Sequence, residues 1–131
     1  MRLLLDTNAW LWMTLASERL GPRTYALLAD SGNAPFLSVV SAWEIVIKAQ
    51  LGKLRVEGAP EDFVRTRLRL QSIAALEVSL DHVLAATHLP SHHRDPFDRL
   101  IVAQAQSEGL TLVSGDQQLA AYPIVFHDAA S

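Results

Sequence analysis

The chain has 131 residues, no cysteine and a formal net charge of −3, and half of its residues are apolar. This length suits a single domain over 1–131, and the lack of cysteine excludes a disulfide scaffold, thiol catalysis and cysteine-bound zinc. The mildly acidic balance argues against a broad basic surface for nucleic acid. Asp6 interrupts the apolar N-terminus, and no apolar run is long enough for a signal peptide or a membrane span. We therefore expect a cytoplasmic protein.

The first half of the chain alternates short apolar runs with helical patterns. The expected elements are a strand over 2–5, helices over 9–16 and 22–31, a strand over 35–39 and a helix over 41–51. In the last of these, Trp43, either Val46 or Ile47, and Leu51 fall on one apolar stripe, which predicts the face that packs into the core. Gly52 follows as a helix stop.

The second half continues the alternation. The expected elements are a helix over 60–70, a strand over 73–78, helices over 79–88 and 96–108, and strands over 110–113 and 124–126. Ser79 is a plausible helix cap, and Gly109 ends the helix before the fourth strand. Strands that alternate with helices predict an α/β fold with a mostly parallel sheet of about four or five strands. Such folds bind their ligands beyond the carboxyl ends of the strands.

Two acidic residues directly follow predicted strands. Asp6 comes after the first strand, and Asp116 comes just beyond the fourth. Both positions lie where the fold rule places a ligand site. Each also has a local explanation, because Asp6 could cap the next helix with help from Thr7 or Asn8, and Asp116 could form a turn.

Two further acids lie near predicted helix starts. The spacing from Ser41 to Glu44 matches a capping box, and Glu44 also faces Lys48 four residues later as an ion pair. Asp95 before a proline is typical of a helix cap, and Asp98 then occupies the third helical position. Taken singly, these acids have structural explanations.

Taken as a set, Asp6, Glu44, Asp98 and Asp116 indicate a metal site. Four like charges in one cleft would repel strongly unless cations neutralise them. Oxygen ligands favour Mg²⁺ or Mn²⁺, and two such ions can activate water against a phosphodiester. The chain contains no Walker A sequence, no G-x-S-x-G and no G-x-G-x-x-G that would support other chemistry.

The chain resembles PIN-domain proteins, and among them the VapC-type ribonuclease toxins of bacterial toxin–antitoxin pairs. The resemblance covers nearly the whole length. It rests on the order and spacing of the segments LLLDTN at 3–8, SVVSAWE at 38–44 followed by LGKL at 51–54, HHRDPFDRL at 92–100 and LVSGD at 112–116.

The resemblance implies a three-layer α/β/α domain and assigns roles to residues. Asp6, Glu44, Asp98 and Asp116 match the family's catalytic acids, which hold Mg²⁺ or Mn²⁺. The implied supporting residues are Thr7, Asn8, Ser114, Arg99 and Asp95, with Asp95 kept as a helix cap and Arg99 placed near the scissile phosphate or the acids.

The same resemblance implies a reaction and partners. It implies a metal-dependent endoribonuclease in which metal-activated water hydrolyses RNA, a homodimer, and a small VapB-like antitoxin whose C-terminal segment blocks the cleft. The alternative is a non-catalytic RNA- or protein-binding module with the same fold. His88, His92 and His93 do not suggest zinc, because their spacing is poor for a tetrahedral site.

Overall fold

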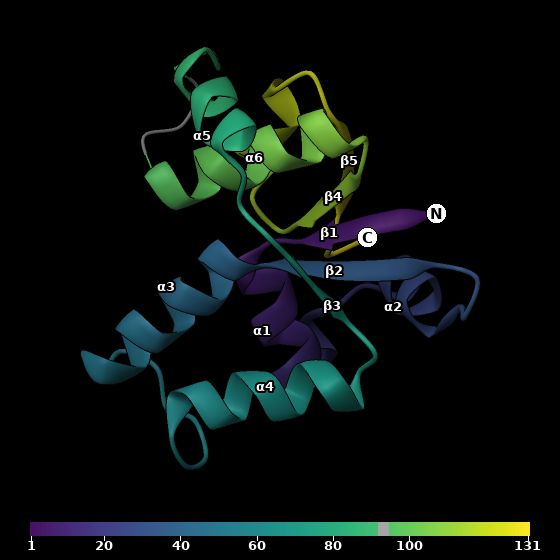
Figure 1. The fold of residues 1–131 in the computed structure, drawn as a ribbon. Coiled ribbons are helices and arrows are strands. Elements are labelled where there is room, and N and C mark those ends of the chain that lie inside the picture. The colour runs from purple at the N-terminus through teal and green to yellow at the C-terminus, as the bar shows by residue number, and fades with distance from the viewer. Residues whose placement is uncertain (92–94) are drawn as a thin grey trace.

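The computed structural model describes residues 1–91 and 95–131 (Figure 1). Its five strands form one sheet in the order β3-β2-β1-β4-β5, and every neighbouring pair is parallel. The strands are β1 (Arg2–Leu5), β2 (Ala34–Ser38), β3 (Ala74–Leu76), β4 (Thr111–Ser114) and β5 (Val125–Asp128). The mostly parallel sheet expected from the sequence is confirmed, and β1 lies at its centre.

Six α-helices and two short 3₁₀ helices connect the strands. They are α1 (Thr7–Leu15), α2 (Pro22–Ala29), α3 (Val39–Gln50), α4 (Pro60–Leu70), α5 (Leu80–Thr87) and α6 (Pro96–Glu108), with 3₁₀ helices at Ser17–Arg19 and Gln117–Ala121. Each expected helix is present, and no helix end differs from its expected position by more than two residues. The two 3₁₀ helices are new, because segments of 3 and 5 residues are too short to show a period. No helix in the described ranges is long and apolar enough to cross a membrane.

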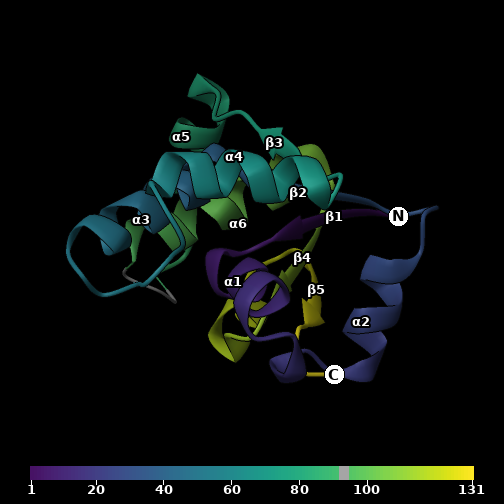
Figure 2. The ribbon, with the colours of Figure 1, turned by 90° about the horizontal axis from the view of Figure 1, so that it is seen from below.

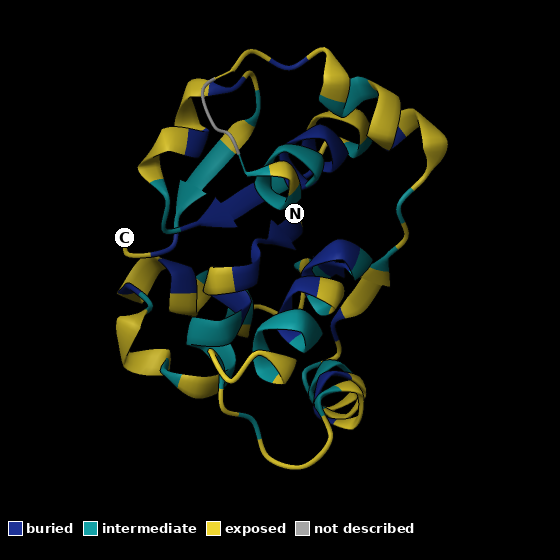
Figure 3. Ribbon diagram, turned by 90° about the vertical axis from the view of Figure 1, so that its left-hand side faces the viewer, coloured by how far each residue is buried: buried dark blue, intermediate teal, exposed yellow. Residues whose placement is uncertain are grey.

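Helices cover both faces of the sheet and so make three layers. In Figure 1, α5 and α6 lie above the sheet, and α1, α2 and α4 lie below it; Figure 2 shows this lower side. Side chains of β1 alternate between the two cores, because successive residues of a strand point to opposite faces. Leu3 and Leu5 pack with Trp10 and Phe63, whereas Leu4 packs with Ile101. Figure 3 shows the central strands buried beneath largely exposed outer helix faces.

Helix α3 crosses the end of the sheet and contributes to both cores. Its Val40 packs on the α6 side, and its Ile45 packs on the α1 side. The predicted core stripe is wrong, because Trp43 is 62% and Leu51 is 64% exposed. The buried face of α3 instead includes the polar side chains of Ser41 and Glu44, which lie at the carboxyl edge of the sheet. Their polar partners at this edge, rather than the spacing of apolar residues, decide which face of the helix is buried.

The predicted capping box at Ser41 is also wrong. Helix α3 begins earlier, because the hydroxyl of Ser38 caps it by accepting a hydrogen bond from the Val40 amide at 3.1 Å. Ser41 therefore lies inside the helix, where it is buried. Its hydroxyl becomes available to side chains of the neighbouring α1.

The predicted end of α3 at Gly52 is confirmed. Gly52 has a left-handed backbone with φ of 74°, which a glycine adopts without steric cost. The amide of Gly52 donates to the Ala49 carbonyl at 3.1 Å, and the Lys53 amide donates to the Lys48 carbonyl at 2.9 Å. This pair of bonds is a Schellman motif. It turns the chain so that Lys53 returns towards the last turns of α3.

Candidate active site

The carboxyl ends of β1 and β4 form the centre of the candidate site. After β1 the chain adds β2 and β3 on one side, and later adds β4 and β5 on the other, so the strand order reverses between β1 and β4. In open parallel sheets this reversal marks the ligand crevice. Asp6 follows β1 directly, and its amide donates to the Val113 carbonyl of β4 at 3.0 Å. Ser114 ends β4, and Asp116 follows two residues later.

Asp6 is a buried carboxylate held by two donors. Only 4% of the residue is exposed. Its Oδ1 accepts the Ala9 amide at 2.7 Å, which caps α1 as expected, and its Oδ2 accepts the Ser114 hydroxyl. Burial raises the pKa of Asp6, and the nearby charges of Asp116 and Glu44 raise it further, although the two hydrogen bonds act in the opposite direction. Three of the four predicted acids therefore interact electrostatically.

Glu44 reaches the same edge from α3 and is 8% exposed. The Thr7 hydroxyl donates to its Oε1 at 2.6 Å and lies 2.9 Å from the Ser41 hydroxyl. The Lys48 ammonium lies 3.0 Å from Oε2, which confirms the predicted ion pair. Thr7 therefore links the end of β1 to α3 and orients Glu44. Neither the capping box nor the ion pair with Lys48 predicted this contact.

Ser114 connects Asp6 to Asp116. Its hydroxyl donates to Asp6 and accepts the Asp116 amide at 3.0 Å. Asp116 also caps the 3₁₀ helix, because its Oδ1 accepts the Gln118 amide at 3.0 Å. The predicted turn role of Asp116 is thus confirmed, and the same loop presents its carboxylate beside Asp6.

Sequence reasoning missed a contact that supports this loop. A Cβ on Gly115 would lie 2.4 Å from Trp12 Cη2 and 2.8 Å from Trp12 Cζ3, so the indole of Trp12 lies directly against the loop backbone. The Arg19 guanidinium lies 4.8 Å from the Trp12 ring centroid. The glycine between Ser114 and Asp116 was a usable signal, because a backbone without Cβ often marks a close approach.

The start of α6 approaches α3 beside Glu44. Phe97 and Trp43 meet edge to face with ring centroids 5.5 Å apart. Asp95 caps α6 by accepting the Phe97 amide at 2.8 Å, as expected. Asp98 follows in the first turn and is half-buried. The structure therefore places Asp98 at the end of α6 that contacts α3.

The remaining two supporting residues are Arg99 and Asn8. The Arg99 guanidinium donates to the carbonyls of Ala86, Leu89 and Pro90, each at 3.0 Å. These bonds tie the end of α5 to α6, while a role of Arg99 towards a phosphate stays a prediction. Asn8 is exposed in the first turn of α1, and within the described ranges no hydrogen bond joins it to the acids. His92 and His93 lie outside the described residues.

The donor set suits a hard cation, although it is not a complete metal cage. Asp6 is buried and feels the charges of Asp116 and Glu44, and all the candidate ligands are oxygens, which Mg²⁺ and Mn²⁺ prefer. In the part of the chain that the structure describes, no three His, Asp or Glu side chains lie close enough together to hold a metal ion. A bound ion would therefore have to draw the carboxylates closer.

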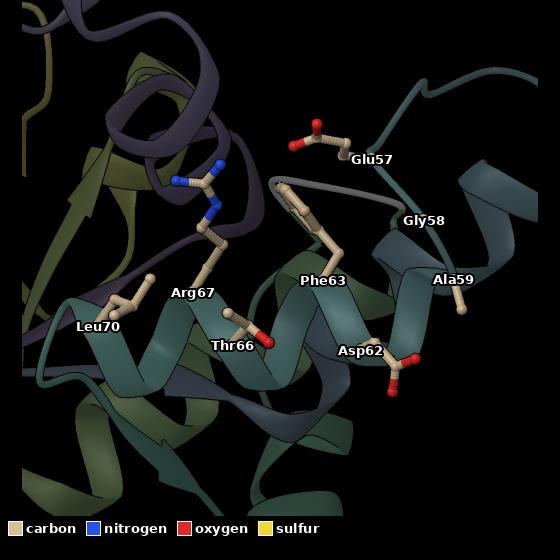
Figure 4. Close-up of a pocket in the computed structure, with 8 residues that line it drawn as sticks. All are labelled: Glu57, Gly58, Ala59, Asp62, Phe63, Thr66, Arg67 and Leu70. Atoms are coloured by element: carbon tan, nitrogen blue, oxygen red, sulfur yellow. The ribbon is translucent and has the colours of Figure 1, made fainter.

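A separate pocket on α4 contains none of these acids. Its volume is about 430 Å³, and Figure 4 shows Phe63, Arg67 and Glu57 around it. The Arg67 guanidinium lies 5.5 Å from the Phe63 ring centroid. This pocket is formed by α4 and the loop that precedes it.

Replacing Thr7 with valine should weaken the Glu44 position. The change keeps the shape of the side chain but removes the hydroxyl that donates to Glu44 at 2.6 Å. A buried acceptor that loses a donor costs about 1–3 kcal/mol. We expect a lower melting temperature in thermal unfolding and an about tenfold lower rate of whatever reaction this site catalyses. Thr7→Ser should preserve both the melting temperature and the rate. Equal activity of the valine and serine variants would remove Thr7 from the site.

The fold and the acidic carboxyl edge together define a doubly wound α/β protein with a candidate cation site at its strand reversal. The model of the PIN domain family matches residues 3–125, and the chain belongs to this family. No curated protein matches the chain.

Several solved structures share this fold. The chain is similar to one in VapBC2 of Rickettsia felis bound to a DNA fragment from its promoter, with a TM-score of 0.74, 17% identity and 98% of each chain covered. It is also similar to one in FitAcB of Neisseria gonorrhoeae (TM-score 0.67, 19% identity, 97% of each chain covered). VapBC-1 of nontypeable Haemophilus influenzae gives a TM-score of 0.65 at 17% identity, with 100% of each chain covered.

Proposed function

We propose that the chain is a Mg²⁺- or Mn²⁺-dependent endoribonuclease that acts as the toxin of a toxin–antitoxin pair. The observation that carries the proposal is the burial of Asp6 at the strand reversal, where it faces the charges of Asp116 and Glu44. Burying an ionised carboxylate beside like charges is unfavourable unless a cation compensates for it. A structural cap alone would not need the two neighbouring acids.

Asp6, Glu44, Asp98 and Asp116 would hold the ion, which supplies Lewis-acid chemistry and lowers the pKa of water when bound. The chain's own contribution is orientation. Ser114 fixes Asp6 relative to the Asp116 loop, and Thr7 fixes Glu44.

The charge balance supports a phosphate-containing substrate. The chain carries a formal charge of −3, which becomes +1 once the four proposed ligands are set aside. The acidic excess therefore lies within the proposed metal site, where a bound ion reverses the local sign. With the ion bound, RNA phosphates would be attracted to this site, although the net charge of the chain alone argues against binding of nucleic acid.

Purified protein should cleave RNA when Mg²⁺ or Mn²⁺ is added and stop when EDTA is added. The competing function, a non-catalytic binding module, is favoured by the finding that no described set of three ligand side chains is close enough for a metal. The two functions separate in one experiment, with end-labelled RNA and a series of metal concentrations. Cleavage that persists in EDTA would overturn the mechanism, and binding without cleavage at any metal concentration would favour the module.

The partner proposals come from the structural relatives. Chains with this fold occur in VapBC complexes and in a toxin–antitoxin complex from Klebsiella pneumoniae. We extend this to a small VapB-like antitoxin that blocks the cleft, a homodimer, and action in the cytoplasm. Expression of the chain alone should arrest bacterial growth, and co-expression of the small protein encoded beside it should restore growth. Normal growth with active, well-expressed protein would argue against the toxin role.

A further inference from the structure

Two aromatic rings meet next to Glu44, and the larger of them is exposed. Trp43 precedes Glu44 in α3 and is 62% exposed, although such a large apolar side chain is usually covered. Its indole contacts the ring of Phe97 edge to face, with the centroids 5.5 Å apart. This contact limits the freedom of the indole and leaves a ring surface open to solvent. We call Trp43 and Phe97 the aromatic pair.

A groove of about 510 Å³ joins the aromatic pair to the proposed site. It is lined by Glu44, Lys48, Lys53, Asp95 and Phe97, and Trp43 lies beside it through its contact with Phe97. Lys48 is held by Glu44 at 3.0 Å, which offsets one of the negative charges. Lys53 is exposed and carries no described ion pair.

The turn at Gly52 gives Lys53 its place in this groove. The Schellman bonds bring the Lys53 amide back to the Lys48 carbonyl at 2.9 Å. Without the left-handed glycine, the chain after α3 would leave in another direction. The groove is therefore built by the end of α3 and the start of α6, and it continues to Glu44.

We propose that the groove holds the single-stranded RNA segment next to the cleaved bond, with a base stacked on Trp43 and a backbone phosphate bound by Lys53. Aromatic platforms combined with cations are the usual means of holding single strands, because every base has a stacking face and every nucleotide a phosphate. Lys53 is an exposed cation close to an exposed ring, and this pairing favours RNA over an apolar peptide, although the groove as a whole carries two carboxylates and two ammonium groups. This inference rests on the proposed nuclease function.

Binding of a labelled single-stranded RNA, measured by fluorescence anisotropy in EDTA, separates stacking from catalysis. We expect Trp43→Leu to weaken binding about tenfold, within the range for the loss of one stacked base. Trp43→Phe should retain most of the affinity. Tyr25→Leu is a matched control, because Tyr25 is also 62% exposed but lies on α2. Equal losses in the Tyr25 and Trp43 variants, or no loss in either, would overturn the stacking role.

Salt dependence tests the phosphate contact. Lys53→Gln should weaken binding and lower the slope of log affinity against log salt concentration by about 0.7, the value for one phosphate contact on a single strand. Arg23→Gln, an exposed cation on α2, should leave the slope unchanged. An unchanged slope for Lys53→Gln would overturn the assignment of Lys53.

Sedimentation velocity of the same variants separates RNA from a second copy of the chain. If Trp43→Leu loses RNA affinity only because an oligomer dissociates, the aromatic pair is a protein contact and the inference fails. RNA binding that depends on Trp43 without any cleavage would retain the inference and overturn the nuclease function. Metal-dependent cleavage with an unchanged KM and affinity in Trp43→Leu would do the reverse.

Discussion

Asp6→Asn should abolish RNA cleavage while leaving the fold intact. The amide can still cap α1 through its oxygen and can still pair with Ser114, so the hydrogen bonds of the buried site are largely kept. What is lost is the negative charge that would hold the cation. Removing several kcal/mol of metal-based stabilisation corresponds to about a 1,000-fold loss of rate or more. Asp62→Asn, an exposed carboxylate in the first turn of α4, should retain wild-type activity.

The same variant should be more stable than the wild type without metal. The pKa of Asp6 is raised above its ordinary value of 3.8, so the folded state binds more protons than the unfolded state between the two pKa values. Stability therefore falls as the pH rises through that window, and above it the ionised carboxylate is fully unfavourable. Asparagine does not ionise, so the stability of the Asp6→Asn variant does not fall in this way as the pH rises. Its advantage in melting temperature should be greatest near neutral pH and should shrink towards pH 3.8.

Metal should reverse this order. An ion that binds only the folded wild type adds about 2.7 kcal/mol at 100 times its dissociation constant. Mn²⁺ titrated in a thermal unfolding assay should raise the melting temperature of the wild type and not that of Asp6→Asn. Full cleavage by the asparagine variant, or equal metal stabilisation of both proteins, would remove Asp6 from the metal site.

Gly115→Ala should disrupt the site through the loop after β4, the strand next to β1. The new Cβ would lie 2.4 Å from Trp12 Cη2, so the indole or the loop must move. Overpacking of this kind costs about 1–3 kcal/mol. The loop carries Ser114 and Asp116 on either side of the glycine, and a displacement of about 1 Å at a reactive centre can cost about 100-fold in rate. We expect a large loss of cleavage with a moderate loss of stability.

A second substitution tests whether the clash is the cause. Trp12→Leu removes the two indole carbons that the new Cβ would meet, so the double variant should regain part of the activity lost in Gly115→Ala. Gly32→Ala is the matched control, because its Cβ would meet only the flexible Asp30 carboxylate at 3.2 Å. Double-variant activity no better than that of Gly115→Ala would point to another role for the glycine.

Local signals predicted much of the fold because they act through neighbouring residues. Asp95 before Pro96 caps α6, Gly52 ends α3, and Glu44 pairs with Lys48, as the sequence indicated. Ser79 also caps α5 as expected, although His82 as its reciprocal partner had not been recognised. Each of these features is decided within four residues, where spacing carries most of the information.

The errors arose where distant contacts decide. The period of α3 indicated that Trp43 and Leu51 were core residues, yet the helix turns Ser41 and Glu44 inward because Thr7, in α1, supplies their polar partner. The contact of Trp12 with Gly115 joins residues about 100 positions apart along the chain, and spacing cannot reveal such a contact. The strand-end rule, which is topological rather than local, singled out Asp6 and Asp116, whereas Glu44 and Asp98 were joined to them only as members of a set.

The pairing of β1 with β4 has a consequence for protein synthesis. Asp6 leaves the ribosome well before its Ser114 partner, which follows 108 positions later. At about 5–20 residues per second, several seconds pass between the synthesis of Asp6 and the synthesis of the strand that completes its surroundings. A nascent chain therefore cannot assemble the proposed centre until β4 and the loop after it have been made. In a cell that makes such a nuclease, an inhibitor that binds early-formed surfaces could be in place before the first RNA is cut.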